Sequence, residues 1–302
     1  MFEVKWVKQF LDYLRYERQY SANTVLAYQR DIQNFEKIVT ANDQAKSFDK
    51  IDGLDVSGFL NTLDQADLAA STVARKVSTL RTFYHFLNQQ QLSDNTPFIG
   101  VATKKQPKRL PQFFYGKEML ALLKACDGDT FADRRDKAII ELLYATGMRA
   151  FELVNLTLPQ LDWDKQIVLI HGKGNKDRYV PFGRYAKAAL EVYLQQSRQP
   201  LLTKLHLAHN VIFVNQRGQG LTTRGLAYIL SQRIKKTALT GDIHPHMIRH
   251  TFATQMLENG ADLRTVQELL GHASLSSTQI YTHVTMTHLQ KDYRKYFPRA
   301  SD

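Results

Sequence analysis

Residues 246–281 read HMIRHTFATQMLENGADLRTVQELLGHASLSSTQIY, and this stretch decides what fold to expect in the second half of the chain. Apolar residues recur in it at helical spacing. The pattern predicts helices over His246–Glu258, Leu263–Leu270 and Ser276–Val284. A glycine directly after a helix is typical of a left-handed residue that ends it, and Gly271 holds that position. The next residue, His272, would then have a fixed direction.

The same stretch gathers side chains suited to holding and attacking a phosphate. His246, Arg249 and His250 fall at i, i+3 and i+4, so they share one helix face that could bind an oxyanion. The two histidines also have a zinc-ligand spacing, but Met247 stands where a metalloprotease has glutamate. Tyr281 would be a weak nucleophile, with a pKa of about 10. It needs a base and fixed positive charge beside the phosphate.

Two further candidates lie about a hundred residues upstream. Arg149 follows Gly147-Met148 at the start of a helix, near Glu152, and a second guanidinium could bracket the phosphate oxygens. Lys173 stands between two glycines at a predicted hairpin tip, from which it could donate a proton to a leaving oxygen.

Working outward, the pattern predicts a mainly α protein with a small antiparallel β-sheet. The first ~95 residues are helical throughout, and one hairpin interrupts the helices of the remainder. Expected helices cover 2–40 (two), 56–63, 71–90, 117–125, 134–145, 185–197, 223–237 and 287–297, and expected strands cover 166–170 and 178–182. We therefore expect a helical domain over 1–100, a linker over 101–111 and a mostly helical second domain over 112–302.

The charge of the chain favours a polyanionic partner. Forty Lys+Arg against 29 Asp+Glu give +11, of which residues 1–110 contribute 15 − 12 = +3 and residues 111–302 contribute 25 − 17 = +8. Residues 192–241 hold seven basic residues and no acid. Nucleic acid is the favoured partner, and a membrane surface is the alternative.

Several basic residues are candidate DNA contacts. The segment 102–110 has four bases, no acid and no apolar periodicity, so it is either a solvated tether or a linker that touches phosphates as the chain wraps a duplex. We favour phosphate contact. The candidates are Lys104, Lys105, Lys108 and Arg109 in the linker, with Arg224 and Arg233 further along.

Targeting features are absent from the sequence pattern. The N-terminal residues MFEVKWVKQFLDYL are broken by charges, and no run of 18 apolar residues occurs, so a cytoplasmic protein without membrane insertion is expected. The one cysteine, Cys126, lies in a helical pattern and is expected in or beside the core.

Five motifs in register resemble the tyrosine recombinase (phage integrase) family. They are Thr146-Gly147-Met148-Arg149 with Glu152-Leu153, Gly172-Lys173-Gly174-Asn175-Lys176-Asp177-Arg178, Pro245-His246-Met247-Ile248-Arg249-His250, Leu270-Gly271-His272 and Thr278-Gln279-Ile280-Tyr281-Thr282-His283. The first domain is similar to the family's helical core-binding domain through residues 21–31 and 71–84. The one departure is Ala150-Phe151, where the family usually has a smaller pair ending in serine.

The resemblance implies a mechanism of DNA cutting and rejoining. Tyr281 would attack the scissile phosphate to give a 3′-phosphotyrosyl link, with Arg149 and Arg249 stabilising the charge on the phosphate. Lys173 would protonate the leaving 5′ hydroxyl, His246 would assist proton transfer at the tyrosine, and His272 would hydrogen-bond the phosphate. No cofactor, metal or ATP enters this chemistry.

Within the family, compactness and the lack of an arm-binding domain favour the Xer-type resolvases of bacterial chromosome dimers. That group implies a Holliday junction, a second, XerD-like recombinase subunit in a heterotetramer on duplex DNA, and a DNA translocase as a further partner. The helix at 287–297 would be exchanged between subunits, or else pack on its own domain. The alternatives are a phage or transposon integrase, a nicking and relaxing enzyme, an inactive DNA-binding regulator and a metal-dependent nuclease.

Overall fold

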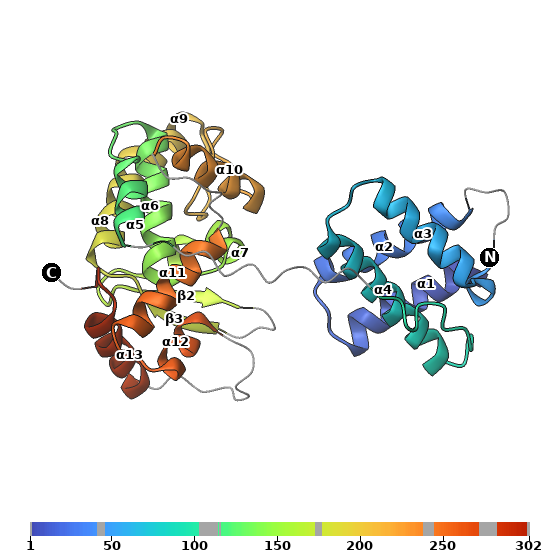
Figure 1. Ribbon diagram of the computed structural model, residues 1–302. Helices are drawn as coiled ribbons and strands as arrows, with labels where there is room; N and C mark the ends of the chain where they lie inside the picture. Colours follow the sequence, from blue (N-terminus) through green and yellow to red (C-terminus); the bar gives the residue numbers. More distant parts are fainter. Residues whose placement is uncertain are drawn as a thin grey trace. The chain divides into compact units, whose positions relative to one another are not determined.

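Apolar side chains form two separate hydrophobic cores, one within residues 1–109 and one within residues 110–302. Figure 1 shows the helices and strands of these two units. The structure is a computed structural model, which describes residues 2–40, 46–102, 114, 116–172, 177–237, 245–271 and 283–300. Each core is built by elements of its own unit, so each unit is described by itself.

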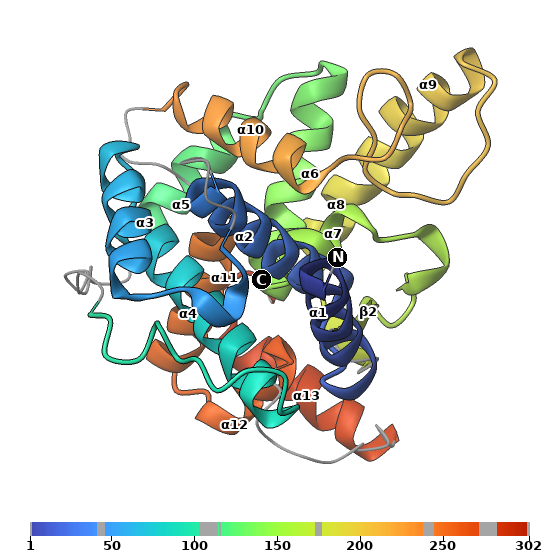
Figure 2. The same ribbon diagram turned by 90° about the vertical axis from the view of Figure 1, so that its right-hand side faces the viewer.

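The first unit is built from helices (Figure 2). They are α1 Phe2–Asp12, α2 Ala22–Thr40, α3 Gly53–Gln65 and α4 Ala70–Gln89, with short turns of π-helix at Tyr13–Glu17 and of 3₁₀-helix at Phe48–Lys50. α2 contacts each of the other three helices. Asp31 of α2 is buried and accepts hydrogen bonds from Thr79 Oγ1 (3.0 Å) and Lys76 Nζ (3.2 Å) of α4. A buried carboxylate needs such partners, so these two hydrogen bonds fix α2 against α4.

The second unit is mostly helical and carries a small antiparallel sheet. Its helices are α5 Gly116–Lys124, α6 Phe131–Thr146, α7 Ala150–Val154, α8 Arg184–Tyr193, α9 Gln199–Lys204, α10 Thr223–Ile234, α11 Pro245–Glu258, α12 Leu263–Leu270 and α13 His283–Tyr296. Its strands are β1 Leu161–Asp162, β2 Ile167–His171 and β3 Asp177–Pro181, in the order β1-β2-β3. Val168 of β2 faces Val180 of β3 in the register.

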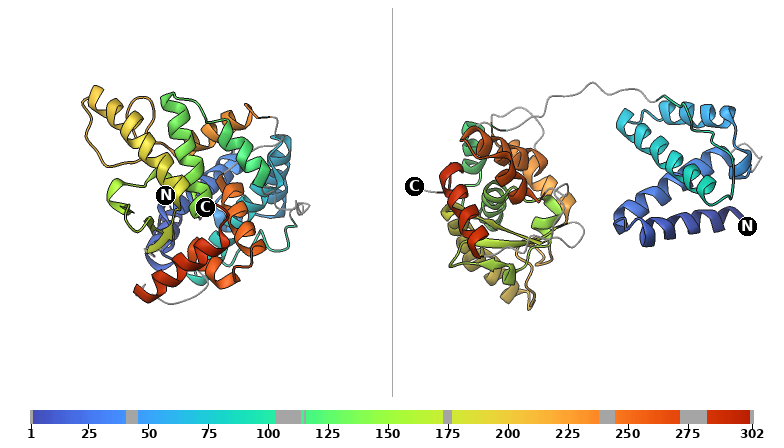
Figure 3. Two further views of the ribbon diagram at one scale, coloured as in Figure 1. Left: turned by 90° about the vertical axis from the view of Figure 1, so that its left-hand side faces the viewer. Right: turned by 90° about the horizontal axis from the view of Figure 1, so that it is seen from below.

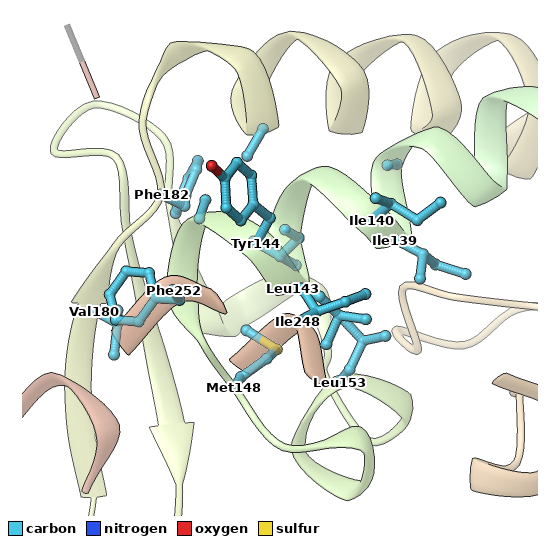
Figure 4. Packing of buried hydrophobic residues seen from close by; sticks show 14 of the residues in the cluster. Ile139, Ile140, Leu143, Tyr144, Met148, Leu153, Val180, Phe182, Ile248 and Phe252 are labelled. Atoms are coloured by element: carbon cyan, nitrogen blue, oxygen red, sulfur yellow. The ribbon is translucent and has the colours of Figure 1, made fainter. Parts of the chain in front are cut away.

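α6 is the central helix of this unit, as its nearly all-round apolar pattern predicts. It contacts α5, α8, α11 and β3, and the left-hand view of Figure 3 shows α8 running beside it. Figure 4 shows Leu143 and Tyr144 of α6 in one buried cluster with Val180 of β3 and with Ile248 and Phe252 of α11. The core therefore holds together the elements that carry the motifs named above.

The predicted fold class is confirmed, and the differences are local. β1 was not expected, and α8 continues through a π-helical turn at Leu194–Arg198 into α9 instead of ending at Ser197. α13 begins at His283, whereas the sequence pattern predicted a start near Thr287. Most of the helix expected over 276–284 lies outside the described residues. Cys126 is buried, and burial raises its thiol pKa to about 12.

α13 packs on its own unit in this structure. It contacts β3, α11 and α12, and the right-hand view of Figure 3 shows it lying along the sheet. Its residues Leu289 and Tyr293 are buried, as is Phe297 directly after it. No helix in the described ranges is both long and apolar enough to cross a membrane.

Candidate active site

Two arginines from different elements share one buried carboxylate. Glu152, in the first turn of α7, accepts from Arg149 Nη1 (2.9 Å) and Arg178 Nη1 (3.0 Å) at Oε1. Its Oε2 accepts from Arg178 Nη2 (2.7 Å) and from the Arg149 backbone N–H (2.7 Å). Arg149 is the N-cap residue of α7, and a glutamate three residues on is the usual partner of such a backbone N–H.

The last turn of α12 brings a third arginine into the cluster. Arg249 of α11 donates from Nη2 to the carbonyl of Leu270 (2.8 Å) and from Nη1 to that of Gly147 (2.7 Å). Arg178 Nε donates to the carbonyl of Leu269 (3.0 Å), and Arg149 Nη2 lies 3.5 Å from that of Gly271. Three consecutive carbonyls at the negative end of a helix dipole thus face three different guanidinium groups.

Two glycines permit this convergence. Gly147 ends α6 with φ +58°, and a Cβ there would lie 2.6 Å from the Phe252 ring and 2.8 Å from Leu270. Gly271 ends α12 with φ +67°, as the sequence predicts, and a Cβ there would lie 2.9 Å from Arg178 Cδ. Any other residue would be strained at both positions; its Cβ would press on Phe252 and Leu270 at position 147 and on Arg178 at position 271.

The cluster has an excess of positive charge. Arg149, Arg178 and Arg249 against Glu152 leave a net +2, and Arg249 is only 7% exposed. The pKa of Arg249 is lowered to about 10, mainly by burial and to a smaller extent by repulsion from Arg149 and Arg178. Burial alone would raise the pKa of Glu152, but the Arg178 and Arg149 contacts outweigh it and the pKa is lowered. The arrangement suits an added anion, and the second hydrogen on each Nη of Arg249 can donate to one.

The structure brings together Arg149 and Arg249 of the predicted catalytic residues. Arg149 is the more accessible, with 38% of its side chain exposed. His246 is exposed in the first turn of α11. The other three predicted residues lie outside the described residues: Lys173, His272 and Tyr281.

Reasoning from sequence assigned no role to Glu152 or Arg178, although both belong to the motifs. Their signals are the three-residue spacing from Arg149 to Glu152 and the alternation along β3, in which Arg178 occupies an inward position. A buried charge is costly unless it is paired, so an arginine at an inward position of a strand indicates a buried acidic or carbonyl partner.

The structure corrects one predicted DNA contact. Arg233 is buried, and it donates to Asp136 Oδ2 (2.7 Å), Asp133 Oδ1 (2.6 Å) and the carbonyl of Ala125 (3.0 Å). Its charge is matched inside the fold, so the prediction that Arg233 meets DNA is wrong. Arg198, another base of the acid-free stretch, is also buried. Arg224 is exposed, whereas the linker candidates Lys104, Lys105, Lys108 and Arg109 lie outside the described residues.

We predict that Arg233→Ala lowers the free energy of unfolding by about 3 kcal/mol, because it removes the guanidinium that Asp133 and Asp136 share and leaves the buried Asp136 with Arg135 as its ion-pair partner. Arg224→Ala, the matched control at the other end of α10, should change it by no more than about 0.5 kcal/mol. That control should instead reduce the salt slope of DNA binding by about one. Urea unfolding and salt-dependent binding measure these effects. Unchanged stability with a reduced salt slope for Arg233→Ala would restore it as a DNA contact.

Comparison with known proteins places both units in one family. The model of the phage integrase family matches residues 112–288, and that of the phage integrase N-terminal SAM-like domain matches residues 7–91. The chain belongs to the phage integrase family, whose members of this kind are tyrosine recombinases that break and rejoin DNA.

The similar proteins agree with the Xer-type resemblance. Tyrosine recombinase XerC of Lacticaseibacillus casei (strain BL23) is 53% identical over 98% of this chain and 99% of its own length. Tyrosine recombinase XerC of Listeria monocytogenes serotype 4a (strain HCC23) is 50% identical over 99% of each chain. The Xer-type prediction is thereby confirmed, and XerC is the member of that group that the sequence pattern favours.

Solved structures share the fold. A post-cleavage complex of the XerH site-specific recombinase bound to a palindromic difH substrate matches with a TM-score of 0.68 at 23% identity. The match covers 95% of this chain and 83% of that chain. The match shows that this chain and the XerH recombinase share one fold.

Proposed function

We propose that the cluster around Glu152 binds the scissile phosphate of duplex DNA, and that Tyr281 attacks this phosphorus. The O–P bond to the tyrosine forms as the bond to the 5′ oxygen breaks, which leaves a 3′-phosphotyrosyl link. Arg149 and Arg249 stabilise the charge that builds on the non-bridging oxygens. The freed 5′ hydroxyl of a partner duplex then attacks this link and releases the tyrosine, by way of a Holliday junction.

Three further residues complete the proposed chemistry. Lys173 gives a proton to the departing 5′ oxygen, and His246 takes the proton of the attacking tyrosine. His272 donates a hydrogen bond to the phosphate. None of these steps draws on a metal ion or on ATP.

The observation that carries the proposal is the charge of the described cluster. A phosphodiester has one negative charge, and its five-coordinate transition state approaches two. The net +2 of the three arginines and Glu152 matches the second state better than the first. The cluster should therefore bind the transition state more tightly than the phosphodiester. Catalysis requires such a preference, because only interactions that are stronger in the transition state raise the rate.

We further propose that the biological reaction is the resolution of chromosome dimers in the cytoplasm. The relatives are named tyrosine recombinase XerC, and the resemblance to the Xer-type resolvases implies this role. In the proposed assembly, this chain and a XerD-like recombinase form a heterotetramer on two DNA sites, with a DNA translocase as a further partner. α13 would then leave its own unit and contact the neighbouring subunit. An integrase of a mobile element would perform the same chemistry without the second recombinase.

Cleavage of a nicked suicide duplex tests this proposal. The duplex carries a candidate chromosome-terminus site, and the protein is assayed with and without a second recombinase, both with EDTA present. We expect a covalent protein–DNA adduct, whose peptide contains Tyr281, and more adduct with the second recombinase. No adduct under either condition, or an adduct on another residue, would contradict the mechanism. Equal cleavage without the second subunit would favour the integrase alternative.

A further inference from the structure

We propose that Arg178 is a positioning residue for DNA cleavage: it holds the two phosphate-facing arginines in place without touching the phosphate itself. The inference rests on the proposed roles of Arg149 and Arg249. The inference adds Arg178, a residue of β3, to the residues that support cleavage. In the proposed function, β3 serves only as the strand that follows Lys173 in the chain.

Arg178 is enclosed by its own partners. It is 2% exposed, and it donates through Nη1 and Nη2 to both oxygens of Glu152 and through Nε to the carbonyl of Leu269. A Cβ on Gly271 would lie 2.9 to 3.2 Å from Arg178 side-chain atoms. The guanidinium thus fills the space between α7, β3 and the end of α12, and no part of it is presented to a ligand.

One route from Arg178 to the phosphate passes through Glu152. The carboxylate that Arg178 holds is the same one that accepts from the Arg149 side chain and backbone. Arg149 alone is a half-exposed partner for this buried acid. Without the bidentate Arg178 contact, Glu152 could turn toward solvent or take up a proton, and Arg149 would turn with it.

The second route passes through the end of α12. Arg178 fixes the carbonyl of Leu269, Arg249 donates to the next carbonyl, and the residue that follows Gly271 is His272. A shift of this turn therefore moves the acceptor of Arg249 and the attachment point of His272 together. Displacements of about 1 Å in such positioning groups are enough to reduce rates by about a hundredfold.

The shape of the guanidinium matters as well as its charge. Lysine keeps the positive charge but places its donors at one point, so it cannot span both carboxylate oxygens and the Leu269 carbonyl. Arg178→Lys therefore separates positioning from charge. We expect this variant to bind the nicked duplex with a Kd within about twofold of the wild type, and to form adduct about 10- to 100-fold more slowly at saturating protein.

A methylphosphonate at the scissile position provides a second substrate. A partial loss of folded protein would lower the cleavage rates on both substrates equally, so it would not change the ratio of wild-type to variant rates between them. The methyl group replaces one non-bridging oxygen and removes the negative charge that the arginines balance. The rate ratio of wild type to Arg178→Lys should therefore shrink on this substrate. Equal rates on the phosphodiester, or a ratio that is the same on both substrates, would overturn the inference.

Arg198→Lys is the matched control. Arg198 is also a buried arginine of the second unit, but it donates to the carbonyls of Val211 and His209 and lies outside the cluster. This control should alter stability without altering the substrate-dependent ratio. If Arg178→Lys does not fold, Arg178→Gln with Glu152→Gln is compared with Glu152→Gln alone. Equal rates support action through Glu152 alone, and a further fall that shrinks on the methylphosphonate supports action through the Leu269 carbonyl as well. A further fall of the same size on both substrates overturns the inference.

Wild type and Tyr281→Phe are run beside these variants. Failure of the wild type to form an adduct, or an adduct with Tyr281→Phe, would refute the proposed function itself. A normal, Tyr281-dependent adduct with full activity of Arg178→Lys would refute only the positioning role.

Discussion

Tyr281→Phe is expected to form no covalent adduct on the nicked suicide duplex, and to bind that duplex with a Kd within about twofold of the wild type. The substitution removes only the hydroxyl oxygen, and without it no bond to phosphorus can form. The aromatic ring and the basic surface remain, so the many phosphate contacts that dominate affinity are unchanged. Denaturing gels measure the adduct, and mobility shift measures the binding.

Tyr228→Phe provides the control for this prediction. Tyr228 is 66% exposed on α10 of the same unit, so its hydroxyl can be removed without disturbing the core. Full adduct formation is expected for this variant. An adduct that persists in Tyr281→Phe would mean that another nucleophile is used, and the assignment of Tyr281 would have to be abandoned.

Elements with a strong periodic pattern were predictable from sequence alone. α6 and the hairpin of β2 and β3 lie within a few residues of their expected bounds, because their apolar spacing directly reflects which face is buried. β1 has two residues and no period to detect. The passage from α8 to α9 was not predicted; the π-helical turn at Leu194–Arg198 stands just before Pro200, which has no N–H to donate.

The site was predictable where a motif names the residue, and not where partners come from distant elements. Arg149, Arg178 and Arg249 all stand in motifs, but a motif does not give a residue's partners, and the contacts that define the role of Arg178 join it to α7 and α12. Arg233 shows the converse error. Its local stretch has no acid, so it was expected on a basic surface, but its partners Asp133 and Asp136 lie on α6, about a hundred residues away. A count of charges within a short stretch of sequence therefore misses ion pairs between residues that are distant in the chain.

Arg249→Ala is expected to remove at least about 3 kcal/mol of transition-state stabilisation, which is a fall of about a hundredfold or more in the cleavage rate. The reason is its placement: a buried guanidinium, held by the carbonyls of Gly147 and Leu270, whose own charge is unfavourable until an anion arrives. DNA affinity should fall much less, since Arg249 is one cation among many. Single-turnover cleavage at saturating protein separates the two effects.

The free energy of unfolding of Arg249→Ala independently tests whether the charge of Arg249 is unfavourable in the absence of an anion. The pKa of Arg249 is lowered on folding to about 10, so at neutral pH its charged form opposes folding, and this penalty is relieved only as the pH rises above 10. Removing the charge offsets part of the loss of the two hydrogen bonds to the carbonyls of Gly147 and Leu270. Arg249→Ala should therefore be less destabilised than Arg233→Ala, whose charge is matched by acids. A pure binding defect would show that Arg249 contributes to affinity and not to the chemical step. A stability loss as large as that of Arg233→Ala would show that its role is mainly structural.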